Sequence, residues 1–281
     1  MKIGVSSYSF EKYRAATGCS YFEMCDIAKE IGFDGIEFTD LLVSEGETVL
    51  ELAEKIKEYC QKIGLEIAAY TVSADFMKKD IGPEVARVKA CVDVCAALGA
   101  KTMRHDACWG MKNDHLFTWR NVIKQIAPHI REIAEYAGSK GVRTCTENHG
   151  YLLQAPERVE QLILEVNHKN YGWLCDIGNF LCADADPVKA VAVAAPYAFH
   201  AHVKDFIYKI GGPCPEGFFT TLGKNWLRGT IIGHGAVPVK QCIDILKAAG
   251  YDGWVSLEFE GLEDNMTALK MGYNLLESCC K

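Results

Sequence analysis

The sequence has no continuous apolar run long enough to cross a bilayer and no excess of basic residues. A membrane-spanning helix needs about 20 mainly apolar residues, so we expect no membrane partner. The formal net charge is −7, whereas nucleic-acid-binding proteins usually present a basic face. We therefore expect no nucleic-acid partner. The first residues enter a strand pattern without resembling a signal peptide, and a cytoplasmic location is expected.

Low-complexity segments and obvious linkers are also missing, and only 8 residues are proline. Because nothing divides the 281 residues, we expect residues 1–281 to form a single domain, a common size for one α/β barrel. The 13 cysteines are scattered through helical and strand patterns. A core of this size needs no disulfides, so we expect packed thiols and a reducing compartment.

Strand-like and helix-like segments alternate along the whole chain, a pattern typical of βα units around a parallel sheet. Eight strands and eight helices are expected, including helices from about Glu47 to Ile63, from Pro83 to Leu98 and from about Leu116 to Gly138. The predicted fold class is α/β, a single (β/α)₈ TIM barrel.

One connection is much longer than the others and runs over about 206–235. Loops of this length in a compact domain are usually functional. In a barrel it would lie over the catalytic face, so we predict a lid. Trp226, Arg228 and His234 within it are candidates for closing over a sugar or an aglycone.

Acidic and imidazole side chains stand at the C-terminal ends of four predicted strands. An unpaired charge buried there would cost several kcal/mol, and the carboxyl ends of barrel strands usually form active sites. We therefore expect a divalent-metal site formed by Glu147, Asp176, His202 and Glu258. Three carboxylates and one imidazole suit Mn²⁺, Mg²⁺, Zn²⁺, Fe²⁺ or Co²⁺, with Mn²⁺ the expected ion. Each residue alone is equally compatible with a structural ion pair.

Further residues near these strand ends are candidates for catalysis or substrate binding. His149 shares a side with Glu147, and a neutral imidazole there is a suitable general base, although a structural histidine is the alternative. Glu258 or Glu260 is the second choice of base, and Glu147 and Glu258 are expected to serve the reaction as well as the ion. The substrate-binding candidates in this group are Glu37, Arg104, His105, Trp109 and Lys204.

Six short motifs, in this order, resemble a known family. They are Phe33-Asp-Gly-Ile-Glu37, Glu147-Asn-His-Gly150, Cys175-Asp-Ile-Gly-Asn179, His200-Ala-His-Val-Lys-Asp205, Gly233-His-Gly235 and Ser256-Leu-Glu-Phe-Glu260. Over nearly its whole length the chain resembles the xylose-isomerase-like barrels called sugar phosphate isomerases/epimerases, which share a domain with endonuclease IV. The resemblance implies the same four metal ligands and proton chemistry beside a carbonyl, through a metal-stabilised enediolate.

Two positions depart from the ketose 3-epimerases of this family, because Leu153 and Asn179 replace an acidic residue and a histidine. The departures favour a lyase, similar to inosose dehydratases or the barrel subunit of C-glycoside deglycosidases, acting on a keto-sugar or oxidised glycoside by β-elimination. The alternative is a sugar epimerase or isomerase. More distant alternatives are DNA repair similar to endonuclease IV and a non-catalytic binding barrel. A homo-oligomer is possible, as is a hetero-oligomer with a small subunit for a deglycosidase.

Overall fold

The computed structural model describes residues 1–110 and 117–281. Eight strands close into a barrel in the order β1-β11-β7-β6-β5-β4-β3-β2, and every neighbouring pair is parallel. These strands are β1 (Lys2–Ser6), β2 (Gly35–Phe38), β3 (Glu66–Val72), β4 (Thr102–His105), β5 (Arg143–Glu147), β6 (Tyr171–Asp176), β7 (Ala198–Val203) and β11 (Trp254–Leu257). The predicted (β/α)₈ barrel is confirmed.

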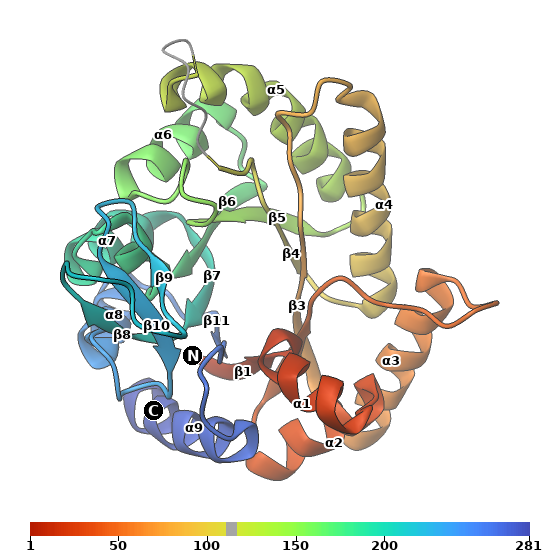
Figure 1. Cartoon of the computed structure of the whole chain (residues 1–281). Coiled ribbons are helices and arrows are strands. Elements are labelled where there is room, and N and C mark those ends of the chain that lie inside the picture. Colours follow the sequence, from red (N-terminus) through yellow and green to blue (C-terminus); the bar gives the residue numbers. More distant parts are fainter. Residues whose placement is uncertain (111–116) are drawn as a thin grey trace.

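Helices surround the strands, as Figure 1 shows in a view along the barrel. In the described part of the chain the α-helices are α1 (Glu11–Thr17), α2 (Tyr21–Ile31), α3 (Val49–Ile63), α4 (Gly82–Leu98), α5 (Trp119–Ser139), α6 (Pro156–Val166), α7 (Pro187–Ala194), α8 (Val239–Ala248) and α9 (Asn265–Cys280). Short 3₁₀ segments are η1 (Ser7–Phe10), η2 (Asn179–Ala183) and η3 (Ala195–Tyr197). None of the described helices is both long and apolar enough to cross a membrane.

Several helix boundaries follow from local capping chemistry. Ser20 and Glu23 form a reciprocal capping box at the start of α2, and Thr48 and Glu51 form another at the start of α3. Helix α3 ends at Gly64 in the left-handed region with φ 66°, where glycine carries no steric penalty. The expected range of α3, about Glu47 to Ile63, therefore agrees with the structure to within about two residues. The expected start of α5 at Leu116 lies outside the described residues.

Two segments near the C-terminal ends of the barrel strands contain elements that were not predicted from the sequence. The segment after β1 forms η1 and α1, for which no element was expected. The long connection after β7 contains β8 (Asp205–Lys209), β9 (Phe219–Thr220) and β10 (Trp226–Thr230), which form an antiparallel sheet in the order β8-β10-β9. Much of this connection is thus regular structure.

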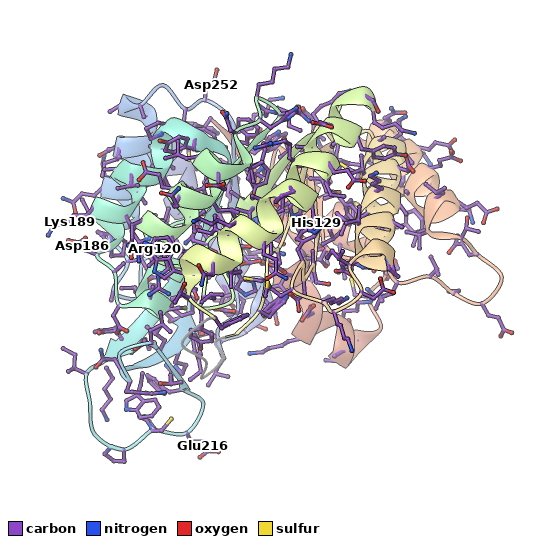
Figure 2. The ribbon with its side chains drawn as sticks, turned by 90° about the horizontal axis from the view of Figure 1, so that it is seen from above. Arg120, His129, Asp186, Lys189, Glu216 and Asp252 are labelled. Atoms are coloured by element: carbon purple, nitrogen blue, oxygen red, sulfur yellow. The ribbon has the colours of Figure 1, made fainter. Side chains whose placement is uncertain are left out.

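This three-stranded sheet, drawn in cyan and blue, stands beside β7 in Figure 1. Figure 2 places Glu216, at the tip of the connection between β8 and β9, at the opposite end of the molecule from Asp252. Because Asp252 precedes β11, the tip projects from the end of the barrel where the strands terminate. The expected position of the connection agrees with the structure, whereas its movement as a lid stays a prediction.

Asp205 anchors the return of this connection to the barrel. Its buried carboxylate accepts backbone N–H bonds from Phe206, Gly233, Gly235 and Val237 at 2.8–3.0 Å. Hydrogen bonds to a charged acceptor contribute more than neutral ones, and buried donors left without a partner are costly. One side chain therefore fixes both ends of a segment about thirty residues long.

Replacing Asp205 by alanine should lower the free energy of unfolding by on the order of 3 kcal/mol, because four N–H groups lose their acceptor. Urea unfolding followed by circular dichroism measures this change. Asp252→Ala, at an exposed position in the turn before β11, is the matched control and should stay within about 0.5 kcal/mol of the wild type. Equal unfolding midpoints for the two variants would contradict the anchoring role.

Candidate metal centre and active site

Three buried carboxylates converge on one histidine at the C-terminal end of the barrel. Glu147 and Asp176 end β5 and β6, and Glu258 directly follows β11. His202 Nδ1 lies 3.9 Å from a Glu147 oxygen and 4.0 Å from an Asp176 oxygen. Its distance to the nearest Glu258 oxygen is 3.7 Å. One ligand atom from each of these side chains lies within 4.8 Å of those from the other three. The structure thus brings together all four residues that the sequence suggested as metal ligands.

His202 is held for this role by Glu37, a buried residue of β2. Its Nε2 lies 2.9 Å from each Glu37 oxygen, and His200 Nε2 lies 2.8 Å from the same carboxylate. A carboxylate that accepts a hydrogen bond from one ring N–H leaves the other nitrogen with its lone pair, as in many metal-binding histidines. Glu37 therefore orients His202 Nδ1 toward the three acidic side chains.

The arrangement of donor atoms fits a divalent ion. Ligand atoms on opposite sides of an ion with bonds of about 2.0–2.2 Å lie up to roughly 4.4 Å apart, and the three distances from His202 Nδ1 fall within this span. His202 Nδ1 and Asp176 Oδ2 are buried and make no hydrogen bond among the described residues, although Asp176 Oδ2 forms an ion pair with Lys204. Buried polar atoms without such partners are rare, so both atoms are suited to coordinate a cation.

The charged groups around the cluster also bear on cation binding. Arg104 Nη2 lies 2.5 Å from a Glu147 oxygen, and Lys204 contacts Glu258 and lies 3.1 Å from Asp176 Oδ2. Burial disfavours ionised Glu147, but Arg104 and His202 hold the pKa of this carboxyl well below its usual range. By contrast, burial and the nearby negative charges raise the pKa of Asp176 to about 7, despite Lys204. Burial lowers the pKa of His202, but Glu37 and Glu258 raise it to about 10. A proton on His202 and a divalent ion are thus alternative partners for the same carboxylates.

A cavity of about 410 Å³ opens above the cluster, within the usual range of about 300–1,000 Å³ for small-molecule sites. Besides metal-ligand candidates, its charged and aromatic lining includes Arg104, Asp106, Trp109, His149, Lys204, Glu260 and Tyr8. Hydroxyl side chains of Thr39, Thr71 and Ser73 also line it. A cavity with many hydroxyl, carboxylate and cationic groups suits a polyhydroxylated ligand.

His149 stands at the edge of this cavity in a defined orientation. Its Nδ1 lies 3.0 Å from Asp106 Oδ1 and 3.2 Å from Arg104 Nη2, and Trp109 meets its ring edge-on at a centroid distance of 4.7 Å. Nδ1 cannot donate to Asp106 and accept from Arg104 at once. Since Arg104 Nη2 also lies 2.9 Å from Asp106 Oδ1, we assign the ring proton to Nδ1, facing Asp106. Nε2 then carries the lone pair and can accept a proton.

The turn after β5 fixes the place of His149. Gly150 has φ 80°, and a Cβ on it would lie 2.9 Å from the Cys108 carbonyl oxygen, so a larger residue would be strained there. The Gly150 carbonyl accepts the Gly110 N–H at 3.1 Å, which joins this turn to the segment after β4. Glycine at this position therefore lets Trp109 and His149 approach each other.

The other predicted substrate residues fall into two groups. Arg104, Trp109 and Lys204 line the cavity with His149, and Arg228 lines a second, adjoining cavity. Four others line neither of these cavities. They are Glu37, which lies beneath His202; His105, packed between Phe76 and Tyr171; Trp226, whose Nε1 donates to the carbonyls of Gly211 and Gly212; and the exposed His234.

The alternation of side chains along a strand explains why His105 lies away from the cavity and Asp106 lies in its wall. Neighbouring residues on a strand point to opposite sides, so Arg104 and His105 could not both face the cavity. The same rule puts Asp106 on the side of Arg104, and Asp106 was missed as a site residue. Tyr8, Thr39 and Thr71 were also missed, although each ends or follows a barrel strand.

A family model for xylose isomerase-like TIM barrels matches residues 25–279. The chain belongs to this family. The resemblance read from the motifs is thereby confirmed. The chain is 24% identical over 210 residues to an inosose dehydratase of Geobacillus thermodenitrificans, a match covering 70% of each protein.

Two solved structures share the fold of this xylose isomerase-like protein over nearly the whole chain. The IOLI protein with a bound zinc atom has a TM-score of 0.78 at 18% identity, covering 100% of this chain and 98% of that one. D-psicose 3-epimerase from Clostridium cellulolyticum H10, solved with D-tagatose, has a TM-score of 0.76 at 15% identity, covering 100% of both chains. The dehydratase and epimerase names identify the family as one of carbohydrate-acting enzymes.

Removing one ligand charge should remove bound metal. Glu147→Gln and Glu258→Gln should each lower the metal content of the purified protein and abolish activity without unfolding the barrel, because the remaining donors no longer match a divalent ion. Elemental analysis after dialysis and circular dichroism measure the two effects. Glu84→Gln is the control, since Glu84 is a buried, ion-paired glutamate outside the cluster. Full activity of chelator-treated, metal-free wild type would count against the metal centre.

Proposed function

We propose that this protein is a metal-dependent lyase that removes the proton beside the carbonyl of a keto-sugar or oxidised glycoside and expels the substituent on the next carbon. The carrying observation is the His149–Asp106 pair, which shares one cavity with the four clustered metal-ligand candidates. A base oriented by a carboxylate beside a metal centre is suited to proton abstraction next to a carbonyl.

A divalent ion held by the four clustered side chains would polarise the carbonyl and acidify the neighbouring C–H bond. His149 Nε2 then accepts that proton, and Asp106 stabilises the imidazolium through Nδ1. The electron pair of the C–H bond forms the carbon–carbon double bond. The bond to the β-substituent breaks, and its electron pair leaves with the substituent, which takes up a proton.

Tyr8 is the proton donor that we assign to the departing group. It lines the cavity together with Glu260. Burial, followed by the charge of Glu260, raises the pKa of Tyr8 to about 12. The phenol therefore keeps its proton at neutral pH and can donate it to an oxygen that becomes basic as its bond breaks.

The positions that differ from ketose 3-epimerases support elimination over epimerisation. Leu153 is buried and supplies no second acid. Asn179 donates a hydrogen bond of 2.8 Å to Glu147 Oε1, so it steadies a metal ligand without itself exchanging protons. The similarity to an inosose dehydratase is consistent with this reading.

Epimerisation is the second candidate, and one observation favours it. Glu258 and Glu260 line the same cavity as His149, so a second proton carrier is present to return a proton to the carbanion carbon. The same abstraction step would then end in an epimer with no bond broken to a substituent. The similarity in fold to an epimerase is compatible with this outcome.

His149→Ala should retain its metal and lose about 10²–10⁴-fold in kcat, the usual contribution of a positioned general base. Asp106→Asn should lose less, because the ring stays in place but its proton is no longer favoured on Nδ1. Steady-state kinetics and elemental analysis measure the two properties. His129→Ala, on the outer helix α5 in Figure 2, is the matched control and should behave as wild type. Near-normal turnover by His149→Ala would move the base to Glu258 or Glu260.

Turnover in D₂O separates the two chemistries. With a 3-oxo-glycoside, the wild type should release the aglycone, leave an unsaturated ketone, and incorporate deuterium beside the carbonyl in recovered substrate. Proton and deuterium NMR record all three. A returned epimer that carries deuterium, with nothing released, would replace the lyase assignment by the epimerase one.

A further inference from the structure

A separate cavity of about 410 Å³ opens at the end of the barrel opposite to the metal cluster. The first residues of β3, β4, β5 and β11 line it, together with residues of α3 and the end of α4. Figure 2 labels Asp252, which precedes β11, at this end of the molecule. The volume is within the range of about 300–1,000 Å³ typical of small-molecule sites. Because the strands run between the two ends, this cavity is distinct from the one above the metal cluster.

Three cationic side chains surround this opposite cavity. They are Lys57 of α3, Lys101 directly before β4, and Arg143 at the start of β5. None of the three forms an ion pair with another described residue. Among the described residues of the lining, the acidic side chain is Glu66, and it is already paired with Lys2 at 2.6 Å. Three positive charges thus meet at one cavity without a carboxylate to balance them.

Neighbouring residues fix the place of Arg143 on the rim of this cavity. Its guanidinium carbon lies 4.7 Å from the centroid of the Phe199 ring, and its Nη2 donates to Thr102 Oγ1 at 3.4 Å. The backbone N–H of Arg143 donates to the carbonyl oxygen of Lys101 at 2.9 Å. The pairing of β4 with β5 therefore brings Arg143 and Lys101 together, although about forty residues separate them in the sequence.

The remaining lining gives the cavity an apolar side next to the charged one. Leu65, Leu98 and Trp254 line it. The alkyl chain of Lys57 lies across Gly99, where a Cβ would come within 3.4 Å of Lys57 Cε. Glycine at the end of α4 thus lets this lysine approach the cavity closely. A ligand that joins an anionic group to a carbon skeleton would find a partner for each part here.

We propose that this opposite cavity binds a phosphate monoester, with the phosphate between Lys57, Lys101 and Arg143 and the organic part against Trp254. A phosphate monoester carries a charge of about −1.5 to −2 at neutral pH, which the three cations can balance. A guanidinium binds two phosphate oxygens at once, and lysine adds a compact positive charge. The formal net charge of the chain is −7, so attraction of an anion depends on this local group of cations.

Isothermal titration calorimetry tests the proposal with two phosphate monoesters, glucose 6-phosphate and AMP, and with their unphosphorylated counterparts, glucose and adenosine. The wild type should bind at least one monoester saturably. Its unphosphorylated counterpart should bind about 10-fold more weakly or less, because charge-assisted hydrogen bonds to the phosphate are lost. A preference between the two monoesters distinguishes a sugar phosphate from a nucleotide as the source of the phosphate.

Three variants that each remove one positive charge locate the bound phosphate. Arg143→Gln and Lys101→Gln should each weaken binding of the preferred monoester by about 10-fold. Lys62→Gln is the matched control, because Lys62 is an exposed lysine of α3 that does not line the cavity, and it should stay within about two-fold of the wild type. Circular dichroism checks that all three variants are folded, and Lys101→Gln decides if Arg143→Gln is not.

Several outcomes would overturn the assignment. Binding that neither Arg143→Gln nor Lys101→Gln changes would put the phosphate elsewhere, such as beside Arg104 and Lys204 in the cavity above the metal cluster. Equal weakening in all three variants would indicate general attraction to positive charge. Equal affinity for a monoester and its unphosphorylated counterpart, or no saturable binding of either monoester, would also refute the proposal.

Discussion

The rest of the structure depends on one constraint, the burial of several carboxylates at one end of the barrel. Glu37 and Asp176 are fully buried, and Glu147 is nearly so. Such groups are tolerated only when each has a charged or hydrogen-bonding partner. The barrel supplies the partners from neighbouring strands: Arg104 lies beside Glu147, and Lys204 lies beside Asp176. The C-terminal ends of parallel barrel strands all lie at one end of the barrel, so the order of the strands brings opposite charges together. The site therefore forms when the barrel closes.

How far along its strand a residue lies decides whether its side chain faces the cavity or lies beneath the residues that do. Glu37 and Glu147 are both acidic residues in barrel strands, yet Glu37 is held under His202 while Glu147 faces the cavity. The tilt of the strands sets this difference in height, because it staggers the residues of neighbouring strands around the barrel. A hydrophobic pattern carries no information on that stagger. For this reason the sequence identified the acidic residues at strand ends but could not tell which would contact a ligand and which would orient a histidine.

The same distinction explains how far the fold was predictable. The barrel strands and most helices follow from local signals, such as the capping boxes at Ser20 and Thr48 and the glycine that ends α3. The sheet of β8, β10 and β9 does not, because Asp205–Lys209 pairs with Trp226–Thr230 across a connection rich in glycine and aromatic residues. Pairing of short segments that lie far apart in the sequence leaves little periodicity to detect. Asp106 is a different case, since strand alternation alone puts it on the same side as Arg104.

Enzymes with this metal cluster can differ in outcome without changing the cluster, because proton abstraction beside a carbonyl is common to elimination and epimerisation. What decides the outcome is the surrounding space: a place for the departing group favours bond breaking, and a second proton carrier favours return of the proton. Here Glu258 and Glu260 offer the carrier, while the sheet anchored by Asp205 borders the second, adjoining cavity. That sheet is additional to the eight barrel strands, whereas Glu258 and Glu260 follow the end of β11. Since both features stand beside the same cluster, the product formed in turnover, and not the cluster, distinguishes elimination from epimerisation.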